Sequence, residues 1–308
     1  MRAAHAIWSF AQQHAKDMQS DKRISVIGIP KTMDNDILWV WQTFGFLSAV
    51  ERAREVIDNL AVEVRSNPRL GVVQLFGSDS GYVVSHAVLA SGMCDAALIP
   101  EEDFSMKALA HHLKQKITIR AQRQGAPIPY GLVVMAETAI PTDAADYLQD
   151  EHIREKIDLD AAETDAVTEF LEMHKMHRRI RGQTKDELRT AGLKIVSRVL
   201  DYLLKSADVN GTVEVPDWRR LRILTNEPRH LLRAIPPRTS DIINAQRLGI
   251  LAVDNAVAGY TDFMVSQWLT EYVLVPLDLV VLGRKRIPRT GIFWKSVIAK
   301  TGQSSPLI

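Results

Sequence analysis

The sequence predicts an α/β protein in which parallel sheets are flanked by helices. Three observations support this fold class. Short runs rich in Val, Ile and Leu recur along the chain, longer stretches with a helical spacing of apolar residues separate them, and the short runs are apolar throughout rather than alternating. Strands that are covered by helices on both faces of a parallel sheet show this continuous apolar pattern.

Six of these runs are predicted strands. In chain order they are residues 24–29, 71–76, 96–99, 132–135, 221–224 and 279–282. Between them, Phe46, Val50 and Ile57 fall on one helical face, Ser105 is placed to cap a helix over residues 106–123, and Ser240 to cap a helix that Gly259 ends. Serine accepts hydrogen bonds from the first amides of a helix, and glycine suits its end.

Two regions stand apart from this alternation. Residues 141–217 are densely charged and keep a helical period, which predicts a helical insertion between two strands. Residues 284–308 are basic, and we expect a solvated tail that is loosely held beyond Thr301.

Composition excludes several classes of protein. Among the 308 residues, 38 Lys and Arg balance 37 Asp and Glu, so no bulk charge attracts nucleic acid or a membrane surface. No apolar run reaches the roughly 18 residues that a spanning helix needs. The single cysteine, Cys94, leaves no internal disulfide framework and suits a reducing cytoplasm. We therefore expect a soluble, cytoplasmic protein.

The first predicted strand leads into a polar loop, residues 30–37. Asp34 and Asp36 stand two residues apart, beside Lys31 and Thr32. One carboxylate could accept the proton of an attacking hydroxyl, the second could organise a metal, and the lysine could offset phosphate charge. From the residues alone, a turn or a helix cap explains the same pattern equally well.

The whole segment Pro30-Lys31-Thr32-Met33-Asp34-Asn35-Asp36 resembles the signature of the ATP- and pyrophosphate-dependent 6-phosphofructokinases. Further segments resemble that family in the same order along the chain. They are Thr43-Phe44-Gly45-Phe46, Phe76-Gly77-Ser78-Asp79-Ser80-Gly81, Ala96-Ala97-Leu98-Ile99-Pro100-Glu101, Val134-Met135-Ala136-Glu137, the pair His230 and Arg233, Asp241, and Arg247-Leu248-Gly249.

The resemblance implies a role for each matching residue. Asp34 would be the general base that takes the proton from the 1-hydroxyl of fructose 6-phosphate, Thr32 would contact the transferred phosphoryl group or the sugar, and Asp36 would help to organise Mg²⁺. Lys31 is typical of the pyrophosphate enzymes, although some ATP enzymes carry it too. The sugar phosphate would be bound by Phe76, Gly77, Ser78, Glu137, His230 and Arg233, with Arg69 and Arg222 reaching over from a neighbouring subunit.

The resemblance also implies the architecture: two Rossmann-like lobes of phosphofructokinase type, the first of them incomplete. Residues 1–45 and 232–283 would be the remnant of the phosphoryl-donor lobe, and residues 46–231 the sugar-phosphate lobe with its insertion. The family's two Gly-Gly-Asp segments, which serve the donor, are absent from this sequence. We expect either a truncated protein or an incomplete sequence.

The function expected from this resemblance is Mg²⁺-dependent phosphoryl transfer from ATP or pyrophosphate to fructose 6-phosphate. The product would be the fructose 1,6-bisphosphate of glycolysis, and the shared site implies a homo-oligomer. An alternative is a catalytically impaired subunit that only binds sugar phosphate, because Ser78 stands where the family has an arginine. A kinase acting on another sugar phosphate is a third interpretation.

Overall fold

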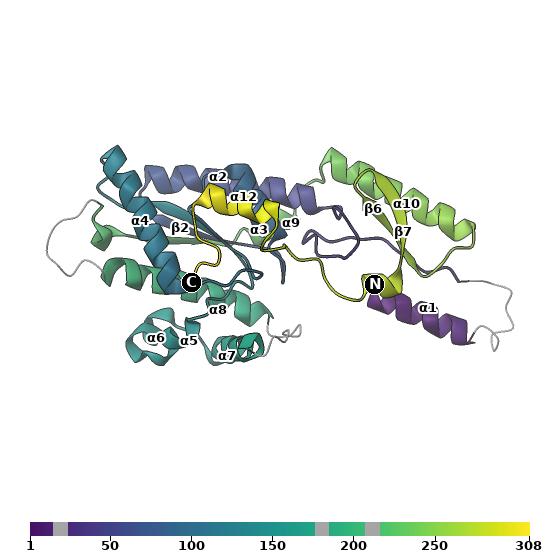
Figure 1. The fold of residues 1–308 in the computed structure, drawn as a ribbon, viewed down its shortest axis with the longest axis horizontal. Helices are drawn as coiled ribbons and strands as arrows, with labels where there is room; N and C mark the ends of the chain where they lie inside the picture. The colour runs from purple at the N-terminus through teal and green to yellow at the C-terminus, as the bar shows by residue number, and fades with distance from the viewer. Residues whose placement is uncertain (15–23, 176–184, 207–215) are drawn as a thin grey trace. The chain divides into compact units, whose positions relative to one another are not determined.

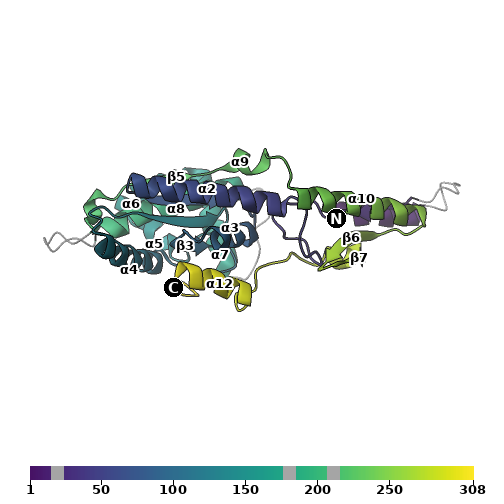
Figure 2. The same ribbon diagram turned by 90° about the horizontal axis from the view of Figure 1, so that it is seen from above.

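The computed structural model describes residues 1–14, 24–175, 185–206 and 216–308. These residues form two compact units (Figures 1 and 2). Unit 1 comprises residues 1–50 and 234–286, and unit 2 comprises residues 51–233 and 287–308. Each unit has its own sheet.

Unit 2 contains a four-stranded sheet in the order β3-β4-β2-β5. The strands are β2 (Leu70–Leu75), β3 (Ala96–Leu98), β4 (Gly131–Ala136) and β5 (Ile223–Asn226), and all neighbours are parallel. Every residue of β2, β3 and β4 is buried, as their continuous Val, Ile and Leu content predicted. The parallel α/β class is therefore confirmed, and all four strands end at one edge of the sheet.

Helices cover both faces of this sheet. α8 (Lys185–Ser206) packs against β2, β5 and α4 (Met106–Gln124), while α3 (Tyr82–Ser91) packs against β3, β4 and α12 (Ile292–Thr301). Figure 1 shows α8 and α12 on opposite sides of the sheet. The Ser105 hydroxyl accepts from the amide of Ala108 at 3.1 Å, which confirms it as the cap of α4.

The described part of residues 141–217 is mainly helical. It contains α5 (Ala144–Gln149), α6 (Glu151–Ile157), α7 (Ala161–Lys175) and α8, and a short turn of 3₁₀ helix, η1 (Trp218–Arg220), follows. Residues 176–184 and 207–215 of the expected insertion lie outside the described residues. Beyond β5, α9 (Arg229–Arg233) completes this part of unit 2.

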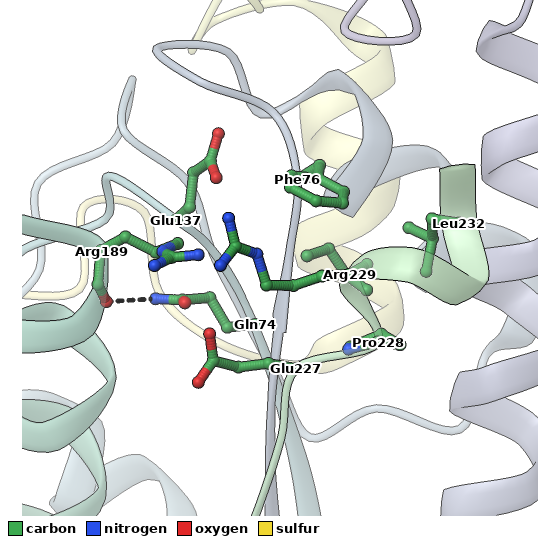
Figure 3. A pocket seen from close by; sticks show the side chains of 9 residues that line it. Gln74, Phe76, Glu137, Arg189, Glu227, Pro228, Arg229 and Leu232 are labelled. Atoms are coloured by element: carbon green, nitrogen blue, oxygen red, sulfur yellow. Dashed lines mark hydrogen bonds between the residues drawn. The ribbon is translucent and has the colours of Figure 1, made fainter. Parts of the chain in front are cut away.

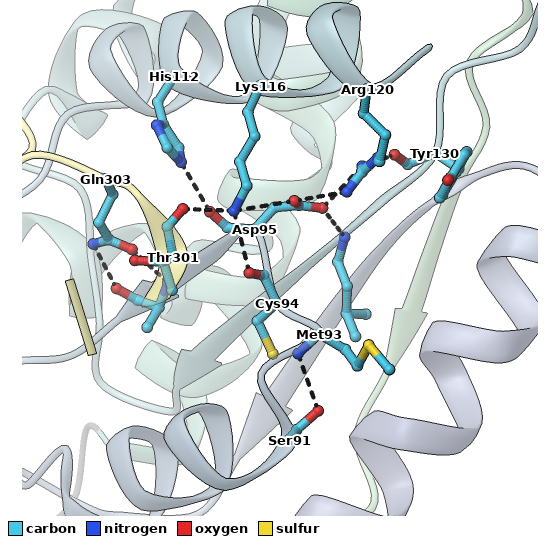
Figure 4. Close-up of polar contacts among 12 residues, drawn as sticks. Ser91, Met93, Cys94, Asp95, His112, Lys116, Arg120, Tyr130, Thr301 and Gln303 are labelled. Carbon is cyan, nitrogen blue, oxygen red and sulfur yellow. Dashed lines mark hydrogen bonds and ion pairs between the residues drawn. The ribbon is translucent and has the colours of Figure 1, made fainter. Parts of the chain in front are cut away.

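A buried ion network fixes β3 to its helices. Asp95, which is 2% exposed, receives two hydrogen bonds from Arg120, at 2.9 and 3.1 Å, and one from the amide of Leu132. Lys116 lies 3.3 Å from the same carboxylate and donates to the Thr301 carbonyl oxygen (Figure 4). The network therefore joins α4, β4 and the end of α12.

The expectation of a loose C-terminal tail was wrong. Residues 292–301 form α12 with Trp294 and Val297 buried, and Leu307 beyond it is 2% exposed. The side-chain amide of Gln303 accepts from the Ala97 amide and donates to the Ala97 carbonyl, so it pairs with the free edge of β3. The basic residues 284–289 suggested a solvated segment, but the apolar residues Trp294, Val297 and Leu307 further along are buried.

Unit 1 contains a mixed three-stranded sheet in the order β1-β6-β7. β1 (Ile27–Gly28) is parallel to β6 (Phe263–Trp268), which is antiparallel to β7 (Glu271–Pro276). α10 (Thr239–Val257) packs on β1 and β6, and α1 (Arg2–His14) packs on α11 (Leu277–Val280). α2 (Phe46–Ser66) contains the division between the two units.

Two further expectations are corrected in unit 1. Residues 279–282 do not form a strand, because Pro276 ends β7 and the chain turns into α11, which buries Leu277 and Val280 one helical turn apart. The helix that Ser240 was expected to cap begins at Thr239, with Arg238 as its N-cap residue. Asp241 instead holds this helix to α2 by accepting from the amide and hydroxyl of Ser48.

Candidate active site

The carboxylate loop predicted from the sequence follows β1 in unit 1 and is organised around Asn35. This residue is buried and adopts φ of +54°, a left-handed conformation that asparagine tolerates. Its Oδ1 accepts from the amide of Thr43 at 3.1 Å and from Lys285 Nζ at 2.9 Å. Sequence reasoning did not give Asn35 a role, yet it fixes the loop that carries both aspartates.

The threonines complete this loop. The Thr43 hydroxyl donates to the Thr32 carbonyl at 2.6 Å, and the Thr32 hydroxyl accepts from the Asp34 amide at 3.2 Å. These bonds place Thr32 and Asp34 beside each other at the carboxyl end of β1, while Lys31 is exposed. Ligands of α/β proteins collect at this end of a strand.

Basic side chains lie beside the second carboxylate. Asp36 forms an ion pair with Arg284 at 3.1 Å, and its carbonyl accepts from the Lys285 amide. The Lys285 ammonium also donates to the carbonyls of Val40 and Trp41. Burial lowers the pKa of Lys285 to about 8, although nearby Asp36 opposes the shift.

Unit 2 has an open cavity of about 210 Å³ at the carboxyl edge of its sheet (Figure 3). The carboxyl ends of β2, β4 and β5 provide three walls, and α8 and α9 provide the others. Its lining residues are Gln74, Leu75, Phe76, Glu137, Arg189, Glu227, Pro228, Arg229 and Leu232. The volume includes open solvent, and the lining combines guanidinium, carboxylate and amide groups, which are groups that bind a small polar ligand.

The loop after β2 orients Glu137. The Ser78 amide donates to Glu137 Oε1 at 2.7 Å, and the Thr138 hydroxyl donates to the Ser78 carbonyl. Ser78 adopts φ of +51° to do so. A Cβ on Gly77 would lie 2.3 Å from the Ser80 carbonyl oxygen, so only glycine fits this tight turn.

Several residues predicted to bind the sugar phosphate meet here. Phe76 and Glu137 line the cavity, Gly77 and Ser78 follow Phe76, and the Arg233 guanidinium lies 4.1 Å from the centre of the Phe76 ring. His230 is exposed on α9 beside Arg229.

Arg69 and Arg222 do not reach this cavity from their own chain. They precede β2 and β5, at the amino ends of the strands, whereas the cavity lies at the carboxyl ends. The six steps from Leu70 to Phe76 span about 20 Å. Arg69 donates to the Asn67 carbonyl and Arg222 is exposed.

Four charged or amide-bearing lining residues were not predicted: Gln74, Arg189, Glu227 and Arg229. Gln74 lies inside an apolar strand. An amide side chain is unusual there, and this feature of the sequence could have identified it as a candidate. Arg229 adjoins the predicted His230. Arg189 lies in the charged insertion, where nothing in the sequence separates it from surface arginines.

The residues that the structure describes contain no group of three or more His, Cys, Asp or Glu side chains placed to hold a metal ion. Mg²⁺ in phosphoryl-transfer sites is commonly held by one or two carboxylates together with substrate phosphates. Asp34 and Asp36 lie on one loop and suit that mode rather than an all-protein cage; Asp36 would have to exchange its ion pair with Arg284 for the metal. Among the described helices, none is long and apolar enough to cross a membrane.

Fold and site together define an α/β protein with a carboxylate loop in one unit and an arginine-lined pocket in the other. The family model described as phosphofructokinase matches residues 9–256. The chain therefore belongs to the phosphofructokinase family.

Known proteins similar to this chain carry related names. It is 30% identical over 284 residues to the ATP-dependent 6-phosphofructokinase of Amycolatopsis methanolica, which covers 91% of this chain and 53% of that enzyme. The corresponding enzyme of Borreliella burgdorferi is 29% identical, with 91% and 54% covered. This chain thus spans about half the length of these curated relatives.

A solved structure supports the fold alone. The pyrophosphate-dependent phosphofructokinase of Nitrosospira multiformis superimposes with a TM-score of 0.62 at 16% identity. The superposition covers 98% of this chain and 64% of that one.

Proposed function

We propose that this chain transfers a phosphoryl group to the 1-hydroxyl of fructose 6-phosphate, as the family resemblance implies. One observation carries the proposal most directly. Phe76 and Glu137, which the resemblance assigns to the sugar phosphate, line one cavity together with Arg189 and Arg229. Hydroxyl acceptors beside guanidinium groups are the chemistry that a sugar phosphate requires.

In the proposed reaction, Asp34 accepts the proton of the 1-hydroxyl as that oxygen attacks the terminal phosphorus of the donor. A new P–O bond forms to the sugar, and the bond to ADP or to phosphate breaks. Thr32, held next to Asp34 at 3.2 Å, contacts the transferred group. When it is bound, Mg²⁺ offsets the charge of the donor phosphates, and Asp36 is the carboxylate that helps to hold it.

The donor is ATP or pyrophosphate. The curated relatives are named ATP-dependent and the structural neighbour pyrophosphate-dependent, while Lys31 favours pyrophosphate. We further propose a soluble cytoplasmic protein and a homo-oligomer. The positions of Arg69 and Arg222, away from their own cavity, suit residues that serve a neighbouring subunit.

The second candidate is a subunit that binds sugar phosphate without turning it over. Ser78 favours this candidate, because the family's arginine at this position would stand near the reacting phosphates. Loss of a positive charge there costs orders of magnitude in rate. In this chain, position 78 carries no positive charge, and its backbone amide donates a hydrogen bond to Glu137.

A coupled assay distinguishes the two candidates. Purified chain, Mg²⁺ and fructose 6-phosphate are mixed with either ATP or pyrophosphate, and fructose 1,6-bisphosphate formation is followed; calorimetric titration with the sugar phosphate runs in parallel. Transfer with either donor supports the enzyme, and saturable binding without transfer supports the binding subunit. Neither transfer nor binding would overturn both.

A further inference from the structure

The pocket of unit 2 contains a buried cation whose donors are largely unused. The Arg189 side chain is 11% exposed, and its Nε and Nη1 atoms are buried without a hydrogen-bond partner among the described residues. Its Nη2 lies 3.6 Å from Asp186, whose carboxylate is 84% exposed. Burial of a charge with unmet donors is unfavourable, and Asp186 meets only Nη2, so hydrogen bonds from Nε and Nη1 to an anion would be favourable.

A second guanidinium approaches from the opposite wall. Arg229 begins α9, and its Nη2 lies 3.9 Å from the same Asp186 carboxylate. Figure 3 shows the two guanidinium groups directed toward one another across the cavity. The only carboxylate that the described residues place within ion-pair distance of both arginines is that of Asp186, which is largely exposed, and the Arg229 side chain is itself 47% exposed. An anionic ligand would attract both guanidinium groups and reduce their mutual repulsion.

A side-chain hydrogen bond to the backbone of α8 helps to hold Arg189 in this position. Gln74 on β2 donates to the Arg189 carbonyl at 2.9 Å, so the first turns of α8 are tied to the strand that ends in the pocket. Gln74 Oε1 is itself buried without a hydrogen-bond partner among the described residues. Glu137 stands in the same cavity, fixed by the Ser78 amide.

We propose that Arg189 and Arg229 form a two-guanidinium clamp for the phosphate of a sugar monophosphate, with Glu137 accepting from a sugar hydroxyl. The clamp rests on the proposed function for its substrate class. It adds two binding residues, one of them supplied by the helical insertion. Each guanidinium can bind a phosphate through parallel hydrogen bonds, so two of them provide more contacts and more positive charge than one arginine does.

The test is calorimetric titration of the full chain with fructose 6-phosphate, inorganic phosphate and fructose. We expect fructose 6-phosphate to bind more tightly than either fragment. Arg189→Gln and Arg229→Gln should each weaken binding about tenfold or more, since each removes hydrogen bonds to a charged group. Arg189→Lys keeps the positive charge but loses the planar guanidinium with its paired donors. Its affinity should lie between that of the Gln variants and that of the parent.

Arg198→Gln is the matched control, because Arg198 lies on the same helix and is exposed. It should leave the affinity unchanged. Thermal unfolding without ligand separates binding from scaffolding: Arg189→Gln should not lower the midpoint, since it removes an uncompensated buried charge. A lower midpoint with unchanged affinity would assign Arg189 to the scaffold and overturn the clamp.

The two proposals fail in different ways. If fructose 6-phosphate binds through Arg189 but is never phosphorylated, the clamp stands and the transfer reaction does not. If the chain phosphorylates fructose 6-phosphate and Arg189→Gln leaves both KM and affinity unchanged, transfer stands and the clamp is wrong. Absence of any fructose 6-phosphate binding by the parent chain also overturns the clamp.

Discussion

At the scale of single residues, two of the partly buried arginines of unit 2, Arg120 and Arg189, have different partners. Arg120 donates two hydrogen bonds to Asp95, whose carboxylate is 2% exposed, and its charge is neutralised within the fold. Within the part of the chain that the structure describes, Arg189 has only the exposed Asp186 within ion-pair distance. The first arrangement stabilises the folded state, whereas the second leaves donors that we propose bind a ligand.

Asp95→Asn tests the structural member of this pair. The substitution leaves Arg120 and Lys116 beside a neutral group, and loss of one partner of a buried ion pair costs about 3–5 kcal/mol. Chemical unfolding should show a loss of that size. Asp217→Asn is the control, because its partner Arg219 is 62% exposed and such pairs contribute little. Equal effects of the two substitutions would contradict the assigned role of Asp95.

At the scale of elements, the C-terminal segment closes an edge of the sheet. Gln303 makes two hydrogen bonds to Ala97 on β3, and Leu307 is buried. Deletion of residues 302–308 would remove both, and truncation of a buried leucine alone costs about 2–5 kcal/mol. It would also expose a strand edge that can pair with other molecules.

Cys94 provides the measurement for this deletion. It is the only cysteine of the chain, it is buried next to β3, and burial raises the pKa of its thiol. We expect thiol labelling of Cys94 to be slow in the parent and at least tenfold faster after the deletion. Removal of the exposed Ile308 alone should have no effect. Unchanged labelling of the longer deletion would show that the segment is not part of the core.

The carboxylate loop of unit 1 has a pH dependence that Lys285 sets. Its pKa is lowered to about 8 in the folded state against 10.5 for an ordinary lysine, chiefly by burial. Between these two pH values the unfolded chain binds more protons than the folded chain, so stability rises with pH across this window. Below about pH 8 both states are protonated and this contribution is flat.

Urea unfolding between pH 7 and 11 checks the Lys285 assignment. The difference in unfolding free energy between the parent and Lys285→Met should grow from about pH 8 to 10.5, in favour of the parent. A difference that stays constant across this range would show that Lys285 titrates as an exposed lysine does.

Much of the fold followed from local patterns, and the exceptions have physical causes. The buried strands β2, β3 and β4 were predicted because a strand covered on both faces must be apolar throughout. β6 and β7 were not predicted, because their hairpin turns at Trp268–Glu271 through Leu269 in a left-handed conformation, without the Asn-Gly or Asp-Gly sequence that marks such turns. Local sequence did not reveal that turn.

Only part of the candidate site could be predicted from the sequence, for a different reason. Asp34, Glu137 and their neighbours follow strands, and the family resemblance picked them out. Arg189 is 115 residues from Gln74, the residue that positions it, so only the folded chain brings them together. A guanidinium on a charged helix resembles any surface arginine until its burial is known.

At the scale of the whole molecule, the candidate site residues are divided between the two units. The carboxylate loop belongs to unit 1, and the arginine-lined cavity belongs to unit 2. The proposed transfer assigns the proton acceptor, Asp34, to unit 1 and the binding of the sugar phosphate to unit 2. The chain spans about half the length of its curated relatives.

The most direct measurement is phosphorus NMR of fructose 6-phosphate with Mg²⁺, the chain, and ATP or pyrophosphate in separate samples. We predict that a phosphate-ester signal at the 1-position grows with one donor. With Asp34→Ala we predict that this signal is absent or at least 100-fold slower to form, while fructose 6-phosphate binds as before. Formation of fructose 1,6-bisphosphate by Asp34→Ala at the parent rate would contradict the account.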